Sequence, residues 1–139
     1  MTVIDPEVGS TDSMWASLKM GRKVVEILDV RSHAPGHHFG RPFMSLYQIA
    51  IEFKNRYPNE FEALGLPVGG RGAGRRNSLA QYIGRMLSSF IRKYGSAYPV
   101  EGCFVSRHHV ATLQYKDGDD VIESSLGDTW DSTVFRLRD

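Results

Sequence analysis

The chain lacks the usual features of secreted and membrane proteins. Cys103 is the only cysteine among 139 residues, so no intrachain disulfide can form and a cytoplasmic setting is expected. No stretch approaches the ~18 apolar residues of a membrane span, so we expect no membrane partner. Residues 1–13 have neither a basic start nor an apolar centre, which is unlike a secretory signal and predicts a flexible N-terminal arm.

Recognised catalytic motifs are also missing. There is no G-x-S-x-G, Walker loop, H-E-x-x-H or dinucleotide fingerprint. The histidines and Cys103 have no recognised zinc-ligand spacing; they are His33, His37, His38, His108 and His109. Cys103 lies on an expected strand, where a small buried residue is favoured over a nucleophile. We therefore expect no metal, no cofactor and a protein that binds a partner without catalysing a reaction.

The composition predicts a folded protein with an uneven charge distribution. Hydrophobic residues make up 41% and charged residues 24% of the chain, which is typical of a globular domain. We expect one α+β domain over residues 14–139. The net charge of +1 conceals a basic middle, residues 54–93, and an acidic tail from residue 117 onward. This asymmetry favours a polyanion on one face, although mixed charges that only maintain solubility would produce it too.

The most informative segment is GGRGAGRRNSLAQYIGRMLSSFIRK, a basic Gly/Arg loop followed by an amphipathic helix. The helix is predicted from a cap at Asn77 or Ser78 to Gly95, with one apolar stripe at i, i+3, i+4 spacing. The opposite side carries Gln81, Arg85, Ser88, Ser89 and Arg92, and the loop carries Arg71, Arg75 and Arg76. Ala80 and Gly84 form a strip of small residues that predicts a close helix contact, either within the fold or across a dimer.

The remaining elements are predicted from periodicity, caps and turns. A first helix over residues 14–28 would be capped by Thr11 or Ser13, although residues 24–28 also fit a strand. A second helix begins at the S-x-x-Q capping box of Ser45 and Gln48 and ends before Pro58, and a short helix is expected around residues 61–64. Strands are expected over residues 103–105, 110–115, 121–123 and 133–137, with a turn at residues 116–119.

Helices followed by a small antiparallel sheet are the order of a winged-helix domain. Residues 43–115 resemble the winged helix-turn-helix family, with FMSLYQIAIEF as first helix, SLAQYIGRMLSSFIRK as recognition helix and GCFVSRHHVATLQY as wing. The resemblance implies a winged-helix-like core over about residues 43–126. Because the family reads DNA through its third helix and its wing, the resemblance implies that Gln81, Arg85 and Arg107 lie at the duplex.

The predicted partner is double-stranded DNA. Arg85 and Gln81 lie one turn apart, and these residue types can form paired hydrogen bonds with guanine and adenine. Ser78, Arg75 and Arg76 lie near the helix N-terminus, where free N–H groups favour phosphate. Arg71 and Arg107 are expected to contact phosphate, and Arg92 completes the surface. In the alternative interpretation these arginines only maintain solubility and the loop is a connector; homodimerisation is compatible with either.

An Mg²⁺-dependent nuclease is the enzymatic alternative. The sequence IAIEFK resembles the E-x-K strand of the restriction-endonuclease-like fold, with Asp29 upstream. That resemblance implies that Asp29 and Glu52 hold the metal and that Lys54 positions water. The hypothesis requires a strand, whereas the Ser45–Gln48 box favours a helix.

A protein-interaction adaptor is the third class. The acidic C-terminal region contains Trp130, Val134 and Phe135, which would dock a partner. Residues 135–138 alternate between apolar side chains and arginines, as expected for an edge strand that could support dimer formation.

Overall fold

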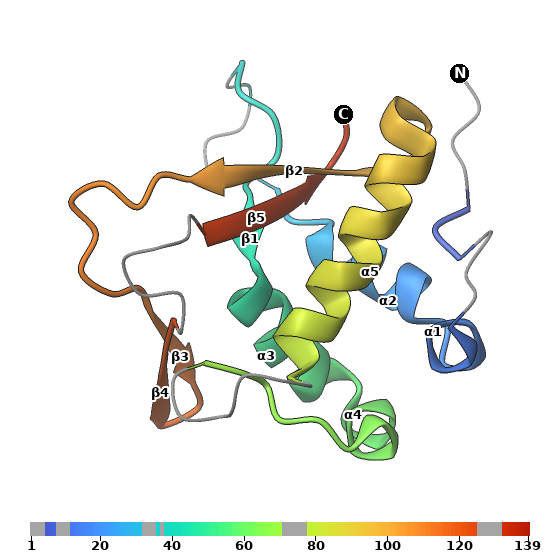
Figure 1. The fold of residues 1–139 in the computed structure, drawn as a ribbon, viewed down its shortest axis with the longest axis horizontal. Coiled ribbons are helices and arrows are strands. Elements are labelled where there is room, and N and C mark those ends of the chain that lie inside the picture. Colours follow the sequence, from blue (N-terminus) through green and yellow to red (C-terminus); the bar gives the residue numbers. More distant parts are fainter. Residues whose placement is uncertain (1–4, 8–11, 32–35, 37, 71–77, 125–131) are drawn as a thin grey trace.

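The computed structural model describes residues 5–7, 12–31, 36, 38–70, 78–124 and 132–139. The helices are α1 (Ser13–Ser17), α2 (Met20–Leu28), α3 (Leu46–Arg56), α4 (Pro58–Leu64) and α5 (Leu79–Tyr94), which a 3-10 turn (Gly95–Ala97) follows. The strands are β1 (Met44–Ser45), β2 (Val100–Val105), β3 (Gln114–Asp117), β4 (Asp120–Glu123) and β5 (Ser132–Leu137). The expected α+β fold with a small antiparallel sheet is confirmed (Figure 1).

The strands form two antiparallel groups. In the main sheet the order is β1-β5-β2, with Met44 opposite Phe135 and Val100 opposite Leu137. The separate β3–β4 hairpin turns at Asp117 and Asp120, where the turn was predicted, and Gly118 has a φ of 62° there. Glycine tolerates this left-handed conformation because it has no Cβ.

Helix α5 packs against α3 and the main sheet, and its apolar stripe lies in the core (Figure 1). Leu79, Ile83, Leu87 and Phe90 are buried, as the spacing predicts. At Gly84 an added Cβ would lie 2.6 Å from Cδ1 of Leu46 on α3. The small-residue strip therefore permits the close helix contact that the sequence predicts, and this contact lies within the fold.

Both ends of α5 are anchored. At the N-terminal end, the N–H groups of Leu79 and Ala80 donate to the carbonyl oxygens of Pro67 and Val68, at 2.7 and 3.0 Å. At the other end, the guanidinium of Arg138 donates to the Tyr98 and Gly95 carbonyls at 2.8 and 3.3 Å, which ties the turn after α5 to the end of β5. A helix held at both ends by the protein has little freedom to shift along its axis.

The N-terminal helical region differs from the prediction. The single helix expected over residues 14–28 is divided at Lys19, which has a left-handed φ of 53°. The division lets Trp15 from α1 and Met20 from α2 both reach the core. The cap is Asp12, not Thr11 or Ser13, and residues 24–28 are helical. Within the predicted arm, the Pro6 carbonyl accepts a 3.1 Å hydrogen bond from the Tyr98 hydroxyl.

The pairing of the C-terminal strands also differs. The expected wing hairpin within residues 102–115 is not formed, because β2 pairs with β5 and the next strand, β3, begins only at Gln114. Strand β5 is central, not at an edge, since it lies between β1 and β2. Val134, Phe135 and Leu137 are all buried, which means that both faces of β5 are covered.

Asp12 caps α1 and links it to α5. Its carboxylate accepts from the N–H groups of Met14 and Trp15 at 3.0 Å each, and from the Tyr82 hydroxyl at 2.9 Å. Burial opposes its ionisation, but these hydrogen bonds, helped by the charge of Arg85, outweigh burial and lower the pKa of Asp12. The charged form is therefore the one that stabilises the fold.

Replacing Asp12 with Ala should lower the free energy of unfolding at neutral pH by about 1 to 2 kcal/mol, as for other N-cap residues. Because the folded-state pKa is depressed, the stabilisation is present above the unfolded-state pKa and is lost as pH falls through the folded-state pKa. Urea denaturation at pH 7 and at roughly pH 2 to 3 would measure the difference. Asp119→Ala, which removes an exposed carboxylate from the hairpin turn, is the control. An equal loss at both pH values would contradict the ionic role of Asp12.

Candidate nucleic-acid interface

The outward side of α5 carries charge of one sign. Gln81, Arg85, Ser88, Ser89 and Arg92 are all exposed, as their helical spacing predicts, while the opposite side is buried. Helix α5 contains no aspartate or glutamate, and its cations are Arg85, Arg92 and Lys93. The protein therefore presents guanidinium, amide and hydroxyl donors on a helix that has no acidic residue of its own.

Arg85 is positioned by its neighbour on the previous turn. Its guanidinium carbon lies 5.8 Å from the centre of the Tyr82 ring, within range of a cation–π contact. Tyr82 in turn donates its hydroxyl hydrogen to Asp12, and burial together with this bond raises the pKa of Tyr82. Because Arg85 is exposed, its planar guanidinium is accessible to an external acceptor from its position near the Tyr82 ring.

The N-terminus of α5 differs from the predicted phosphate site. Ser78 is only 3% exposed, and its hydroxyl accepts a 3.1 Å hydrogen bond from the N–H of Gln81. The preceding N–H groups, of Leu79 and Ala80, donate to loop carbonyl groups. The first-turn N–H groups predicted to bind phosphate are therefore already used, and Ser78 serves as the helix cap.

The basic loop before α5 is only partly described. Arg71, Arg75 and Arg76 fall in residues 71–77, which lie outside the described residues. The point where the loop begins is close to the hairpin: at Gly70, with a φ of 98°, an added Cβ would lie 2.8 Å from the carbonyl oxygen of Glu123 on β4. The loop therefore connects a point beside β4 to the N-cap of α5.

Arg107 lies in the connection between β2 and β3, which begins directly after Val105. Its side chain is exposed. Nearby, the hydroxyl of Ser106 and Nδ1 of His108 are 2.9 Å apart. The structure therefore places Arg107 on an irregular connection after β2, and not on the hairpin strand predicted as a wing.

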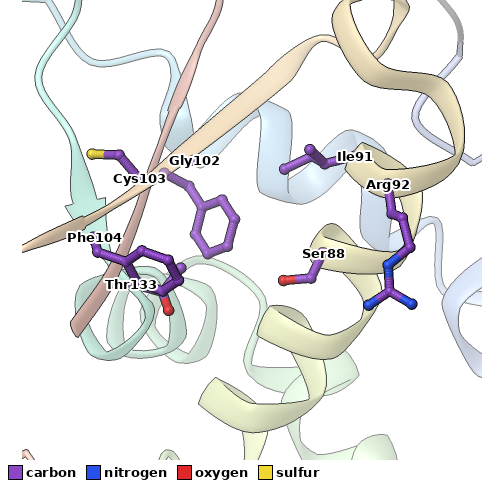
Figure 2. Close-up of a pocket in the computed structure, with 8 residues that line it drawn as sticks. Ser88, Ile91, Arg92, Gly102, Cys103, Phe104 and Thr133 are labelled. Carbon is purple, nitrogen blue, oxygen red and sulfur yellow. The ribbon is translucent and has the colours of Figure 1, made fainter. Parts of the chain in front are cut away.

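A groove that the sequence did not predict lies between α5 and the main sheet. It has a volume of about 250 Å³. Its lining residues are Ser88, Ile91 and Arg92 from α5, Gly102, Cys103 and Phe104 from β2, and Thr133 and Phe135 from β5. Figure 2 shows Ser88 and Ile91 pointing toward the strands, and the Cys103 sulfur pointing away from α5. The groove thus adjoins Arg92 of the predicted recognition surface and Ser88 on the same exposed side of α5.

Two residues of the groove differ from what the sequence indicates. Phe104 is 70% exposed, although a phenylalanine on a strand usually faces the core. Cys103 is exposed, so the expectation that it is buried is wrong. Both lie in the second half of β2, which is exposed from Gly102 onward although it pairs with β5, a strand distant in sequence. A local pattern carries no signal for that pairing.

The segment of the nuclease hypothesis is helical. Helix α3 begins with the predicted capping box, in which Ser45 and Gln48 exchange hydrogen bonds of 2.7 and 3.2 Å. The three residues of the hypothesis have separate partners: Glu52 binds Arg56 at 2.8 Å, Lys54 binds Asp117 at 2.6 Å and Asp29 lies 3.8 Å from Arg41. Within the described ranges, no three His, Cys, Asp or Glu side chains are grouped to hold a metal. The E-x-K strand that the hypothesis requires is not formed.

The apolar residues of the adaptor hypothesis belong to the core. Val134 is 8% and Phe135 1% exposed, so neither is available to dock a partner. Trp130 lies outside the described residues. The C-terminal strand therefore supports the sheet and does not offer the predicted docking surface.

Known proteins give no independent indication of what this surface binds. No family model, curated protein or solved structure matches the chain. None of the helices in the described part of the chain has the length and apolar character needed to cross a membrane.

Variants of Ser78, the N-cap of α5, and of Ser88, on its exposed side, distinguish the effect of a capping serine from that of a surface serine. Ser78→Ala should lower the free energy of unfolding by about 1 kcal/mol, because it removes the acceptor for the Gln81 N–H. Ser88→Ala, on the exposed side of the same helix, should change it by less than about 0.5 kcal/mol. Chemical denaturation of both variants measures the two values. If Ser78→Ala lowers the free energy of unfolding no more than Ser88→Ala does, the capping role of Ser78 is contradicted.

Proposed function

We propose that this protein binds double-stranded DNA through the outward side of α5, without catalysing a reaction. One observation carries the proposal: α5 turns its apolar side to the core and exposes Gln81, Arg85, Ser88 and Arg92 along the other, with no acidic residue on the helix. DNA is the polyanion whose major groove admits an α-helix. In this proposal the basic residues before α5 would add contacts to flanking phosphates.

The spacing of the exposed residues fits a groove-bound helix. From Gln81 to Arg92 the helix rises roughly 16 Å, or about five base-pair steps of 3.4 Å. Arg85 would donate two hydrogen bonds to a guanine edge, and Gln81 would bond an adenine edge. Arg92 would bind phosphate. Arg71, Arg75, Arg76 and Arg107 are assigned as further phosphate contacts, whereas Ser78 is left out because it is buried.

The winged-helix resemblance supports this arrangement in one respect. Helices α3, α4 and α5 follow one another and α3 contacts both of the others, as a three-helix DNA-binding unit requires. In that arrangement α5 is the recognition helix. The connection that carries Arg107 would take the place of a regular wing as a contact to the backbone.

Fluorescence anisotropy of a labelled mixed-sequence duplex, titrated at several salt concentrations without divalent metal, tests the proposal. Affinity should fall with salt by roughly 0.9 log units per log unit for each phosphate contacted. Replacing Arg75 and Arg76 together with Ala should weaken binding to all sequences about equally and reduce the slope by roughly 1.8. Arg22→Ala on α2, which removes an exposed arginine paired with Asp5 at 3.6 Å, is the control. No binding at low salt would overturn the proposed function.

Arg85 should determine sequence preference rather than general affinity. After selection of a preferred site, Arg85→Ala should cost about 1 to 3 kcal/mol of discrimination between that site and mixed sequence. Arg85→Lys keeps the charge but loses the planar fork, so it should retain the salt slope and still lose discrimination. Competition binding measures both. If Arg85→Ala discriminates like the parent, Arg85 does not read a base.

A further inference from the structure

The groove between α5 and the main sheet has one aromatic wall. Every second residue of β2, namely Val100, Gly102 and Phe104, lies on the same face of the sheet. Val100 is buried, while Phe104 is 70% exposed beyond the end of the core. Phe104 pairs with Thr133 of β5, so both line the groove. At Gly102 an added Cβ would lie 2.9 Å from the Phe135 ring, which shows that this ring covers the glycine. Phe104 therefore presents a flat apolar surface toward solvent beside α5.

The opposite wall, on α5, combines one apolar side chain with a hydroxyl and a guanidinium group. Ile91, Ser88 and Arg92 line it, and Ser88 and Arg92 belong to the exposed stripe of α5 that also contains Arg85. Figure 2 shows Ser88 and Ile91 directed toward the strands and the Arg92 side chain extending beside α5. None of the eight lining residues is acidic. The groove volume of about 250 Å³ exceeds the ~150 Å³ cavity known to accept benzene, so one planar ring fits. The matching ligand has a planar ring and a negative charge a short distance away, as a nucleotide does.

We propose that this groove receives one unpaired nucleobase of a bound DNA strand, with the base on Phe104 and the adjoining phosphate at Arg92. The inference rests on the proposed function, since it concerns the same face of α5. Stacking of a base on an aromatic side chain is tolerant of sequence because every base has a π face. An unpaired base also avoids much of the cost of leaving the helical stack. The protein therefore distinguishes distorted duplex from regular duplex.

Anisotropy titrations of two labelled duplexes, identical except for one central unpaired thymine in the second, test this inference on the full chain. The bulged duplex should bind about tenfold more tightly than the regular one. Phe104→Leu keeps an apolar side chain but removes the π face, so it should abolish most of this preference, while Phe104→Trp should retain it. Phe104 is largely exposed, so neither change removes a core contact. Val121→Ala on β4, which alters another exposed apolar residue, is the control and should leave the preference unchanged.

The outcomes separate this inference from the proposed function. Equal affinity for both duplexes, with the Arg85 and salt effects intact, would overturn the base site and leave duplex binding in place. Loss of the preference in the Val121 variant as well would also overturn it. Sedimentation of the free protein adds one more test: a dimer that Phe104→Leu dissociates would assign Phe104 to contact with a second copy and overturn the base site. Absence of binding to either duplex would overturn both proposals together.

Discussion

Burial of the apolar side of α5 is the constraint on which the rest of the structure depends. Leu79, Ile83, Leu87 and Phe90 enter the core shared by α1, α2, α3 and the main sheet. With about 25 cal/mol per Å² of apolar surface removed from water, such a stripe contributes several kcal/mol relative to an exposed helix. The helix cannot rotate about its axis without exposing these side chains. Its polar side, and hence the arrangement of Gln81, Arg85 and Arg92, is determined by that burial.

Features that depend on neighbouring residues could be predicted from the sequence. The Ser45–Gln48 box begins α3, the turn at residues 116–119 joins β3 to β4, and the period of α5 separates buried from exposed positions. The division at Lys19 and the choice of Asp12 as the cap were not predicted. The division brings both Trp15 and Met20 into the core, and Asp12 adds to its local capping bonds one from Tyr82, 70 residues further along the chain.

The candidate site also combines features that follow from neighbouring residues with features that depend on contacts distant in sequence. The exposed stripe of α5 follows from helical periodicity alone. Ser78 is buried where the next two residues of the chain donate hydrogen bonds to the carbonyl groups of Pro67 and Val68. The groove depends on the strand register that places Phe104 opposite Thr133. Pairing between strands so far apart requires loop closure and leaves no local signal in a single sequence. The same pairing places Cys103 at an exposed edge and Phe135 in the core.

Hydrogen bonds at both ends fix the position of α5 in the fold. The carbonyl groups of Pro67 and Val68 hold its start, and Arg138 holds the turn after it. The spacing of its outward residues is therefore fixed by the fold, and alignment of a partner with them would cost little backbone entropy. Helix α5 is also in close contact with α3, because the Leu46 side chain fills the space beside Gly84. A larger side chain at Gly84 would meet Leu46 and act on both helices, so a change in the interior would reach the outward side of α5.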